Sequence, residues 1–97
     1  MKAILITYNQ AYYDEIAKVL NDNGTKGYTE WNEIKGHGSE TGVPHYGTHA
    51  WPTLNNAIIS IVDDDKVDGI LDGLRAKDEA FHDLGLRAYV WNVERAL

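Results

Sequence analysis

Cysteine is absent from the 97-residue sequence, which excludes disulfides, thiolate-bound zinc, iron–sulfur clusters and cysteine nucleophiles. Basic residues are few: nine Lys and Arg stand against fifteen Asp and Glu, for a formal net charge of −6. An acidic chain repels phosphate backbones, so nucleic acid is not expected as a partner. Long apolar runs are also missing, which argues against direct membrane insertion and a signal peptide. We therefore expect a cytoplasmic protein with a single domain over residues 1–97.

The first half of the chain predicts a strand, a helix and a second strand. Residues 3–8 form a short apolar run rich in β-formers, typical of a buried strand. Asn9 can cap the helix that follows, and Gly24 can end it. The helix carries four residues at helical spacing on one stripe: Tyr13, Ile16, Ala17 and Leu20. Residues 27–35 alternate like a strand, but the alternation slips near Trp31, as an inserted bulge residue would cause.

The second half predicts a strand, a helix and a last strand. Residues 56–62 and 86–93 are the strands, and Gly85 marks the end of the helix between them. The helical stripe consists of Val67, Ile70, Leu71, Leu74, Phe81 and Leu84. The acidic residues 63–65 precede this helix, where carboxylates can cap the N-terminus and interact favourably with the helix dipole. A carboxylate metal site is the alternative interpretation of the same three residues.

The element order β-α-β-β-α-β predicts an α+β, ferredoxin-like fold. Such a fold has a four-stranded antiparallel sheet with both helices on one face. The other face then needs a cover, because a large exposed apolar face is costly. Tyr8, Trp31, Tyr89 and Trp91 are the candidates for that open face. We therefore expect the protein to form an oligomer through it.

Residues 36–52 are the longest stretch without periodicity, and loops of this length are often functional. Three of the four histidines of the chain, His37, His45 and His49, lie in this loop together with Glu40. Neutral imidazole is a common ligand of zinc and copper, so these four side chains are a candidate divalent-metal site. The alternative is a polar loop whose histidines stack on aromatic rings or form local hydrogen bonds.

Several segments together resemble the P-II family of signalling proteins. Residues 24–29 and 33–38 resemble the family's Gly-x-x-Gly-x-Thr and Glu-Val-Lys-Gly-x-Gly motifs, which form its second strand and the start of its long loop. Residues 57–68 resemble the third strand, and residues 88–94 resemble the fourth. The likeness covers most of the chain in the same order.

The resemblance implies a homotrimer that binds an effector in the clefts between subunits. Its long loop would contact a regulated partner protein, such as a membrane transporter. The family's effectors are ATP or ADP, with 2-oxoglutarate. Carried over by position, Thr29 would meet the adenine base, and Gly36 and Gly38 would let the backbone approach phosphate. Arg87 would stand near the family's phosphate-binding lysine.

The sequence also departs from the family pattern at the phosphate site. Ser39 replaces an arginine, and Glu40 replaces a glutamine that helps to hold magnesium and 2-oxoglutarate. Residues 76–84 stand in place of a glycine-rich phosphate loop. Each lost charge-assisted contact costs about 1.5–3 kcal/mol. Tight ATP binding, as in the family's nitrogen regulators, is therefore not expected.

We predict a non-enzymatic P-II-like sensor that binds a metal ion or an adenine nucleotide and regulates a partner through residues 36–52. One alternative is a CutA-like trimer that binds a divalent metal. Another is a dimeric ferredoxin-like barrel enzyme, a monooxygenase or isomerase, with the loop histidines lining its pocket. A third is a structural interaction module, which would respond to no small molecule.

Overall fold

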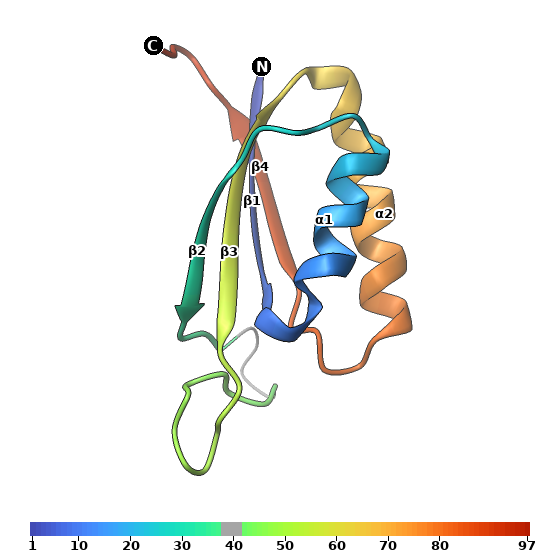
Figure 1. The fold of residues 1–97 in the computed structure, drawn as a ribbon. Coiled ribbons are helices and arrows are strands. Elements are labelled where there is room, and N and C mark those ends of the chain that lie inside the picture. The colour runs from blue at the N-terminus through green and yellow to red at the C-terminus, as the bar shows by residue number, and fades with distance from the viewer. Residues whose placement is uncertain (38–41) are drawn as a thin grey trace.

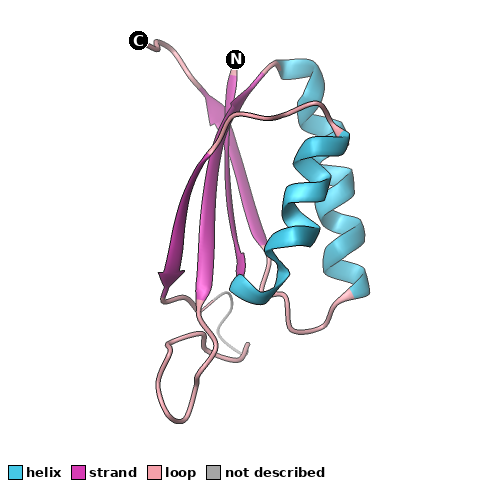
Figure 2. Cartoon of the chain, in the orientation of Figure 1, coloured by secondary structure: helices cyan, strands magenta, loops and turns pink. Residues whose placement is uncertain are grey.

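The computed structural model describes residues 1–37 and 42–97 of the chain. Its elements are β1 (Lys2–Asn9), α1 (Tyr13–Asp22), β2 (Thr29–Ile34), β3 (Asn55–Val62), α2 (Val67–Ala80) and β4 (Arg87–Asn92). The strands form one antiparallel sheet in the order β2-β3-β1-β4, and both helices cover the same face (Figures 1 and 2). The predicted ferredoxin-like α+β fold is confirmed.

The core lies between the sheet and the two helices. Alternate residues of β1 point to it, and Ile4, Ile6 and Tyr8 are each 0% exposed. Buried residues of the helices pack against them: Ile16, Val19, Leu20, Ile70 and Leu74. The prediction that Tyr8 lies on the open face is therefore wrong. Tyr8 follows Ile4 and Ile6 at a spacing of two residues, which places it on the helix side.

The start and end of α1 follow the local sequence signals. The Asn9 side chain accepts a hydrogen bond from the Ala11 amide at 3.0 Å, so it caps the 3-10 turn Gln10–Tyr12 that leads into α1. Gly24 follows the helix with φ +70°, a backbone conformation that favours glycine. Both predictions are confirmed.

The start and end of α2 differ from the sequence prediction. No side-chain cap is made by Asp63, whose backbone oxygen accepts from the Lys66 amide at 3.0 Å in the 3-10 turn Asp64–Lys66. At the other end the helix stops at Ala80, and Phe81 is extended. Leu84 is 0% exposed but reaches the core from the loop before β4. Leu84 fitted the predicted helical stripe because it faces the same core as the apolar residues of the helix.

A bulge interrupts the pairing of β2 with β3, as the sequence predicts. The register shifts between Trp31 and Ile34. Within the bulge Glu33 has φ +58°, and it is the one positive φ at a non-glycine residue that the structure describes. Its amide donates to the Asn56 side-chain oxygen at 3.2 Å. The bulge therefore has its own hydrogen bond, although the ladder is broken there.

The sheet face away from the helices carries large exposed apolar side chains. Trp31 is 50% exposed, Tyr89 56% and Trp91 46%, as expected for the open face. Ile61, at 49%, belongs to the same face because it pairs with Ala3, which also pairs with Trp91. This patch is called the open face below. Of the helices described, none is both long and apolar enough for a membrane crossing.

Candidate functional site

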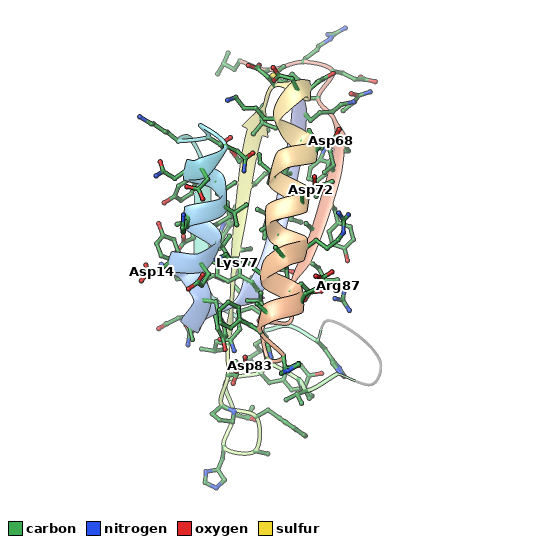
Figure 3. All side chains as sticks on the ribbon, turned by 90° about the vertical axis from the view of Figure 1, so that its right-hand side faces the viewer. Asp14, Asp68, Asp72, Lys77, Asp83 and Arg87 are labelled. Carbon is green, nitrogen blue, oxygen red and sulfur yellow. The ribbon has the colours of Figure 1, made fainter. Side chains whose placement is uncertain are left out.

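A cavity of about 380 Å³ lies at the end of the sheet from which the long loop leaves. Asn9 at the end of β1, His45 of the loop, and Arg87 at the start of β4 contribute to its lining. His82 and Asp83, from the segment between α2 and β4, also line it. Figure 3 shows Asp83 and Arg87 at this end of the molecule. We call it the loop-base cavity.

His45 is fixed in the wall of the loop-base cavity. Its backbone pairs with Gly36 through two hydrogen bonds of 2.8 and 2.7 Å, which close the base of the long loop. Its side chain is buried, and Nδ1 lies 2.6 Å from the Asn55 side-chain oxygen. Because an amide oxygen only accepts hydrogen bonds, Nδ1 carries the hydrogen in this pair. In the neutral ring Nε2 is then the acceptor.

Two glycines make room for the pair of His45 and Asn55. A Cβ at Gly36 would lie 2.1 Å from the Asn55 side-chain nitrogen. A Cβ at Gly85 would lie 2.8 Å from Cε1 of His45, and Gly85 also has φ +60°. Side chains at either position would therefore displace the His45–Asn55 pair.

The segment between α2 and β4 is held to the end of β1. The Asn9 amide donates to the Leu84 oxygen at 2.7 Å, and its side-chain nitrogen donates to the Asp83 oxygen at 3.0 Å. The Tyr12 hydroxyl donates to the Asp83 carboxylate, and this hydrogen bond raises the pKa of Tyr12. The segment is thus oriented by contacts with β1 and with the turn that follows it.

The charges around the loop-base cavity are mixed. Among the described residues of its lining, Arg87 is the one permanent cation, and Asp78 and Asp83 supply two carboxylates. One nitrogen of the Arg87 guanidinium already donates to the Leu86 oxygen at 2.8 Å. Such a site can bind a polar ligand that carries few negative charges, because additional phosphates would meet the carboxylates.

The residues predicted for nucleotide binding divide between the two edges of the sheet. Thr29 begins the edge strand β2, and Arg87 begins the edge strand β4. Three strand spacings separate these edges, or about 14 Å. Gly36 lies near the loop-base cavity through its bridge to His45. Gly38 lies outside the described residues.

The loop histidines do not gather into a metal site among the described residues. His37 bonds to the Gly42 oxygen at 2.8 Å and to the Tyr46 hydroxyl at 3.1 Å, and its ring packs edge-on against Tyr46. His45 is bound to Asn55, and His49 is exposed. Residues 1–37 and 42–97 contain no group of three metal-binding side chains, counting His, Asp and Glu. Glu40 lies outside the described residues, so the metal hypothesis gains no support.

Sequence reasoning missed several residues of the loop-base cavity. The position of His82 in the sequence fits the second predicted helix, but the structure places it in the loop before β4, where it lines the cavity. The sequence did contain an indication that the apolar stripe of the helix is interrupted before His82. Lys77 and Asp78 are charged, and they stand at positions where apolar residues would continue the stripe. Lys77 instead forms an ion pair of 2.5 Å with Glu15 of α1. Nothing in the sequence indicated that Asn55 belongs to the site, because its partner His45 reaches it only through the fold of the long loop.

A ferredoxin-like sheet with a long loop between its second and third strands is the architecture that the P-II resemblance implies. The family model described as nitrogen regulatory protein P-II matches residues 1–97. The chain therefore belongs to the P-II family. No curated protein sequence gives a significant match.

Solved structures similar to this chain include CPII, a nitrogen regulatory PII-like protein from Thiomonas intermedia K12. Its complex with ADP, AMP and bicarbonate is 25% identical, with a TM-score of 0.73, and the match covers 97% of this chain and 88% of that one. Its complex with ADP and bicarbonate is 26% identical, with a TM-score of 0.72 and the same coverage. A putative PII-like signalling protein from Thermus thermophilus is 26% identical, with a TM-score of 0.66, covering 95% and 85%.

Proposed function

We propose that this protein is a non-enzymatic sensor that binds an adenine nucleotide between its subunits and regulates a partner protein through residues 36–52. The observation that carries the proposal is the position of Thr29 and Arg87 at opposite edges of one sheet. These two residues can share one nucleotide only if β2 of one subunit lies beside β4 of another. A homotrimer, which the P-II resemblance implies, would bring the two edges together in this way. We propose that this trimer is cytoplasmic.

The nucleotide that fits best is ADP or AMP. Of the residues that the structure describes in the lining of the loop-base cavity, Arg87 is the one permanent cation, and two are carboxylates. A triphosphate would bring more negative charge than this set can neutralise. The complexes of CPII with ADP and AMP support the same choice. Bicarbonate, which accompanies the nucleotide in those complexes, is the second ligand to test, with the Arg87 guanidinium as its proposed partner.

The long loop is the proposed contact with the partner protein. A turn near its far end is closed by a hydrogen bond of 2.9 Å from the Thr48 amide to the Trp51 oxygen. Trp51 is 42% exposed, and Val43 on the same loop is 64% exposed. Exposed aromatic and aliphatic side chains are the usual anchors of protein contacts. A membrane transporter is the kind of partner that the resemblance implies.

Titration calorimetry with ADP and AMP, in the presence and absence of bicarbonate, tests the nucleotide proposal. Replacing Arg87 by Ala should weaken ADP binding about 10- to 100-fold, because a charge-assisted hydrogen bond contributes about 1.5–3 kcal/mol. Arg75→Ala is the matched control, since Arg75 lies on α2 and pairs with Asp72 at 3.0 Å. Equal affinities for both variants would contradict the assignment of Arg87.

A second arm of the experiment addresses the metal and enzyme alternatives. Zinc and copper are titrated against the wild type, and His49→Ala reports on the exposed loop histidine. We expect no specific metal binding, since His37 and His45 are engaged in other hydrogen bonds. Saturable metal binding in the wild type that is lost in His49→Ala would support the CutA-like alternative. The barrel-enzyme alternative requires a dimer, and the mass of the assembly distinguishes it from a trimer.

A further inference from the structure

The neutral His45 side chain offers a ligand in the loop-base cavity one hydrogen-bond acceptor and no donor. Its Nδ1 donates to the Asn55 side-chain oxygen at 2.6 Å, so Nε2 carries a lone pair. The Asn55 side-chain nitrogen lies toward Gly36, where a Cβ would stand 2.1 Å from it. His45 is 7% exposed and Asn55 5%, so water does not compete for their hydrogen bond. The buried pair therefore fixes the tautomer of the ring.

The Arg87 guanidinium lines the same cavity of about 380 Å³ and supplies donors to it. A guanidinium has five N–H groups, and Nη1 of Arg87 donates to the Leu86 oxygen at 2.8 Å. The other N–H groups suit planar oxyanions, which bind a guanidinium through parallel hydrogen bonds. A ligand that touches both residues meets a cation with donors at Arg87 and a neutral acceptor at His45.

The other ionisable groups in the described lining are less suited to accept a hydrogen bond from an anion. Asp78 and Asp83 carry negative charge, which repels an anion. The Asp83 carboxylate also accepts a hydrogen bond from the Tyr12 hydroxyl. His82 is exposed, so water competes for its ring nitrogens. His45 is neutral and buried, and it can accept from an anion without repelling it.

Arg87 and His45 together fit a small oxyanion that has a single negative charge and retains one O–H group. Its charged oxygens accept from Arg87, and its O–H group donates to Nε2 of His45. An anion without such a group would bring an oxygen lone pair against the Nε2 lone pair and leave Nε2 unpaired. Bicarbonate, the second ligand of the proposed function, has the required chemistry, because two of its oxygens share the charge and the third carries the hydrogen.

We propose that His45 determines the specificity of the loop-base cavity and selects bicarbonate over planar anions that have no O–H group. Asn55 is the positioning residue, because it holds the hydrogen on Nδ1 and so makes Nε2 the acceptor. His45 also pairs with Gly36 at the base of the long loop, so the residue that recognises the anion belongs to that loop. This inference rests on the proposed function and adds to it the group that recognises the bicarbonate hydrogen.

The test compares the affinity of the wild type for bicarbonate, nitrate and acetate by NMR titration at about pH 7.5, with and without ADP. Nitrate and acetate are planar anions of similar size and the same charge, and neither has an O–H group. Imidazole is mostly neutral at this pH. Bicarbonate should bind about 10-fold or more tightly than the other two, because a ligand that leaves Nε2 unpaired loses a hydrogen bond. Equal affinities for the three anions overturn the inference.

Asn55→Asp reverses the hydrogen bond at Nε2 without changing the net charge of the pair. A carboxylate beside Nδ1 favours the imidazolium form of His45, in which both ring nitrogens donate. The preference for bicarbonate over nitrate should then fall to about 2-fold or less. Asn92→Asp is the matched control and should keep the preference, since Asn92 is exposed at the far end of β4 and bonds to Lys2 at 2.5 Å.

A double variant, His45→Leu with Asn55→Leu, keeps the inference testable if Asn55→Asp does not fold. Replacing both partners leaves neither of them buried and unpaired, so the double variant should unfold cooperatively. It should bind bicarbonate and nitrate with equal affinity. If it still prefers bicarbonate, another group such as His82 accepts the hydrogen, and the assignment to His45 is wrong.

Nitrogen-15 spectra of the His45 ring supply a readout that a purely structural role would not change. The hydrogen should lie on Nδ1 in the free protein, and bicarbonate but not nitrate should shift the Nε2 signal. A hydrogen on Nε2 in the free protein overturns the inference. A wild type that prefers bicarbonate but binds neither ADP nor AMP supports the role of His45 and contradicts the nucleotide proposal. ADP binding without a preference for bicarbonate has the opposite meaning.

Discussion

Single glycines decide whether the wall of the loop-base cavity can form. Gly36 and Gly85 both contact the His45–Asn55 pair so closely that a Cβ would overlap it. Gly27, in contrast, has no atom within 4 Å of the place that a Cβ would occupy, and its φ is not positive. The chain therefore offers a test in which the same substitution is made at a constrained and at an unconstrained glycine.

Replacing Gly85 by Ala should lower the stability by about 2–3 kcal/mol. A left-handed backbone costs a non-glycine residue about 1–2 kcal/mol, and the new Cβ must also displace the His45 ring. The corresponding fall in Tm is about 10 °C for a domain of this size. Urea and thermal unfolding measure it.

The control for this prediction is Gly27→Ala, whose stability should stay within about 0.5 kcal/mol of the wild type. Equal losses for the two variants would show that the contact with His45 does not matter. A loss confined to Gly85→Ala, together with weaker ADP binding, would connect the packing of His45 to the ligand site.

At the scale of elements, local signals predicted most of the fold and failed where tertiary contacts decide. The strands, the Asn9 cap and the slip near Trp31 follow from patterns within a few residues. The end of α2 does not, because Leu84 is buried from a loop at a position that also fits a helical stripe. Hydrophobic periodicity indicates that a residue faces the core. It does not show whether that residue lies in a helix or in a loop.

The bulge in β2 makes a prediction at this scale. Glu33 holds φ +58°, so Glu33→Gly should raise the stability by about 0.5–1 kcal/mol, because removing a Cβ penalty of about 1–2 kcal/mol outweighs the added freedom of the unfolded chain. The Glu33 amide keeps its hydrogen bond to Asn56, because only the side chain is removed. Urea unfolding of both proteins measures the difference.

Asn32→Gly is the neighbouring control. Asn32 lacks a positive φ, so glycine there should cost about 0.5–1 kcal/mol through the added freedom of the unfolded chain. Opposite signs for the two adjacent substitutions are the expected result. A loss of stability in both would mean that the backbone at Glu33 carries no strain.

At the scale of the whole molecule, the candidate site could be predicted only in part. Of the residues that the resemblance predicts, Arg87 lines the loop-base cavity and Gly36 pairs with His45 in its wall. His82 and Asn55 were missed because they join the site through contacts between distant segments, such as the 2.6 Å bond from His45 to Asn55. The remaining residues of a shared cleft would belong to another subunit. A pattern along one chain carries no information on how two copies meet.

The open face makes the last prediction, which concerns assembly. Trp91 is 46% exposed on a sheet face that also carries Trp31, Ile61 and Tyr89. A glutamate at Trp91 would place a charge within an interface formed by this face, and a charge that is buried without a partner is strongly unfavourable. Light scattering after size-exclusion chromatography should show three times the chain mass of 10.9 kDa for the wild type and a single chain for Trp91→Glu.

Assembly and ligand binding can then be separated. Val43→Glu, on the exposed part of the loop, should keep the full mass, and Arg87→Ala should keep the mass but lose ADP affinity. Trp91→Glu should lose both the trimer mass and the ADP affinity, because the proposed nucleotide site joins Thr29 of one subunit to Arg87 of another, and these residues lie at opposite edges of one sheet. If single chains of Trp91→Glu bind ADP as tightly as the wild type, the nucleotide lies within one subunit, and the loop-base cavity alone must hold it.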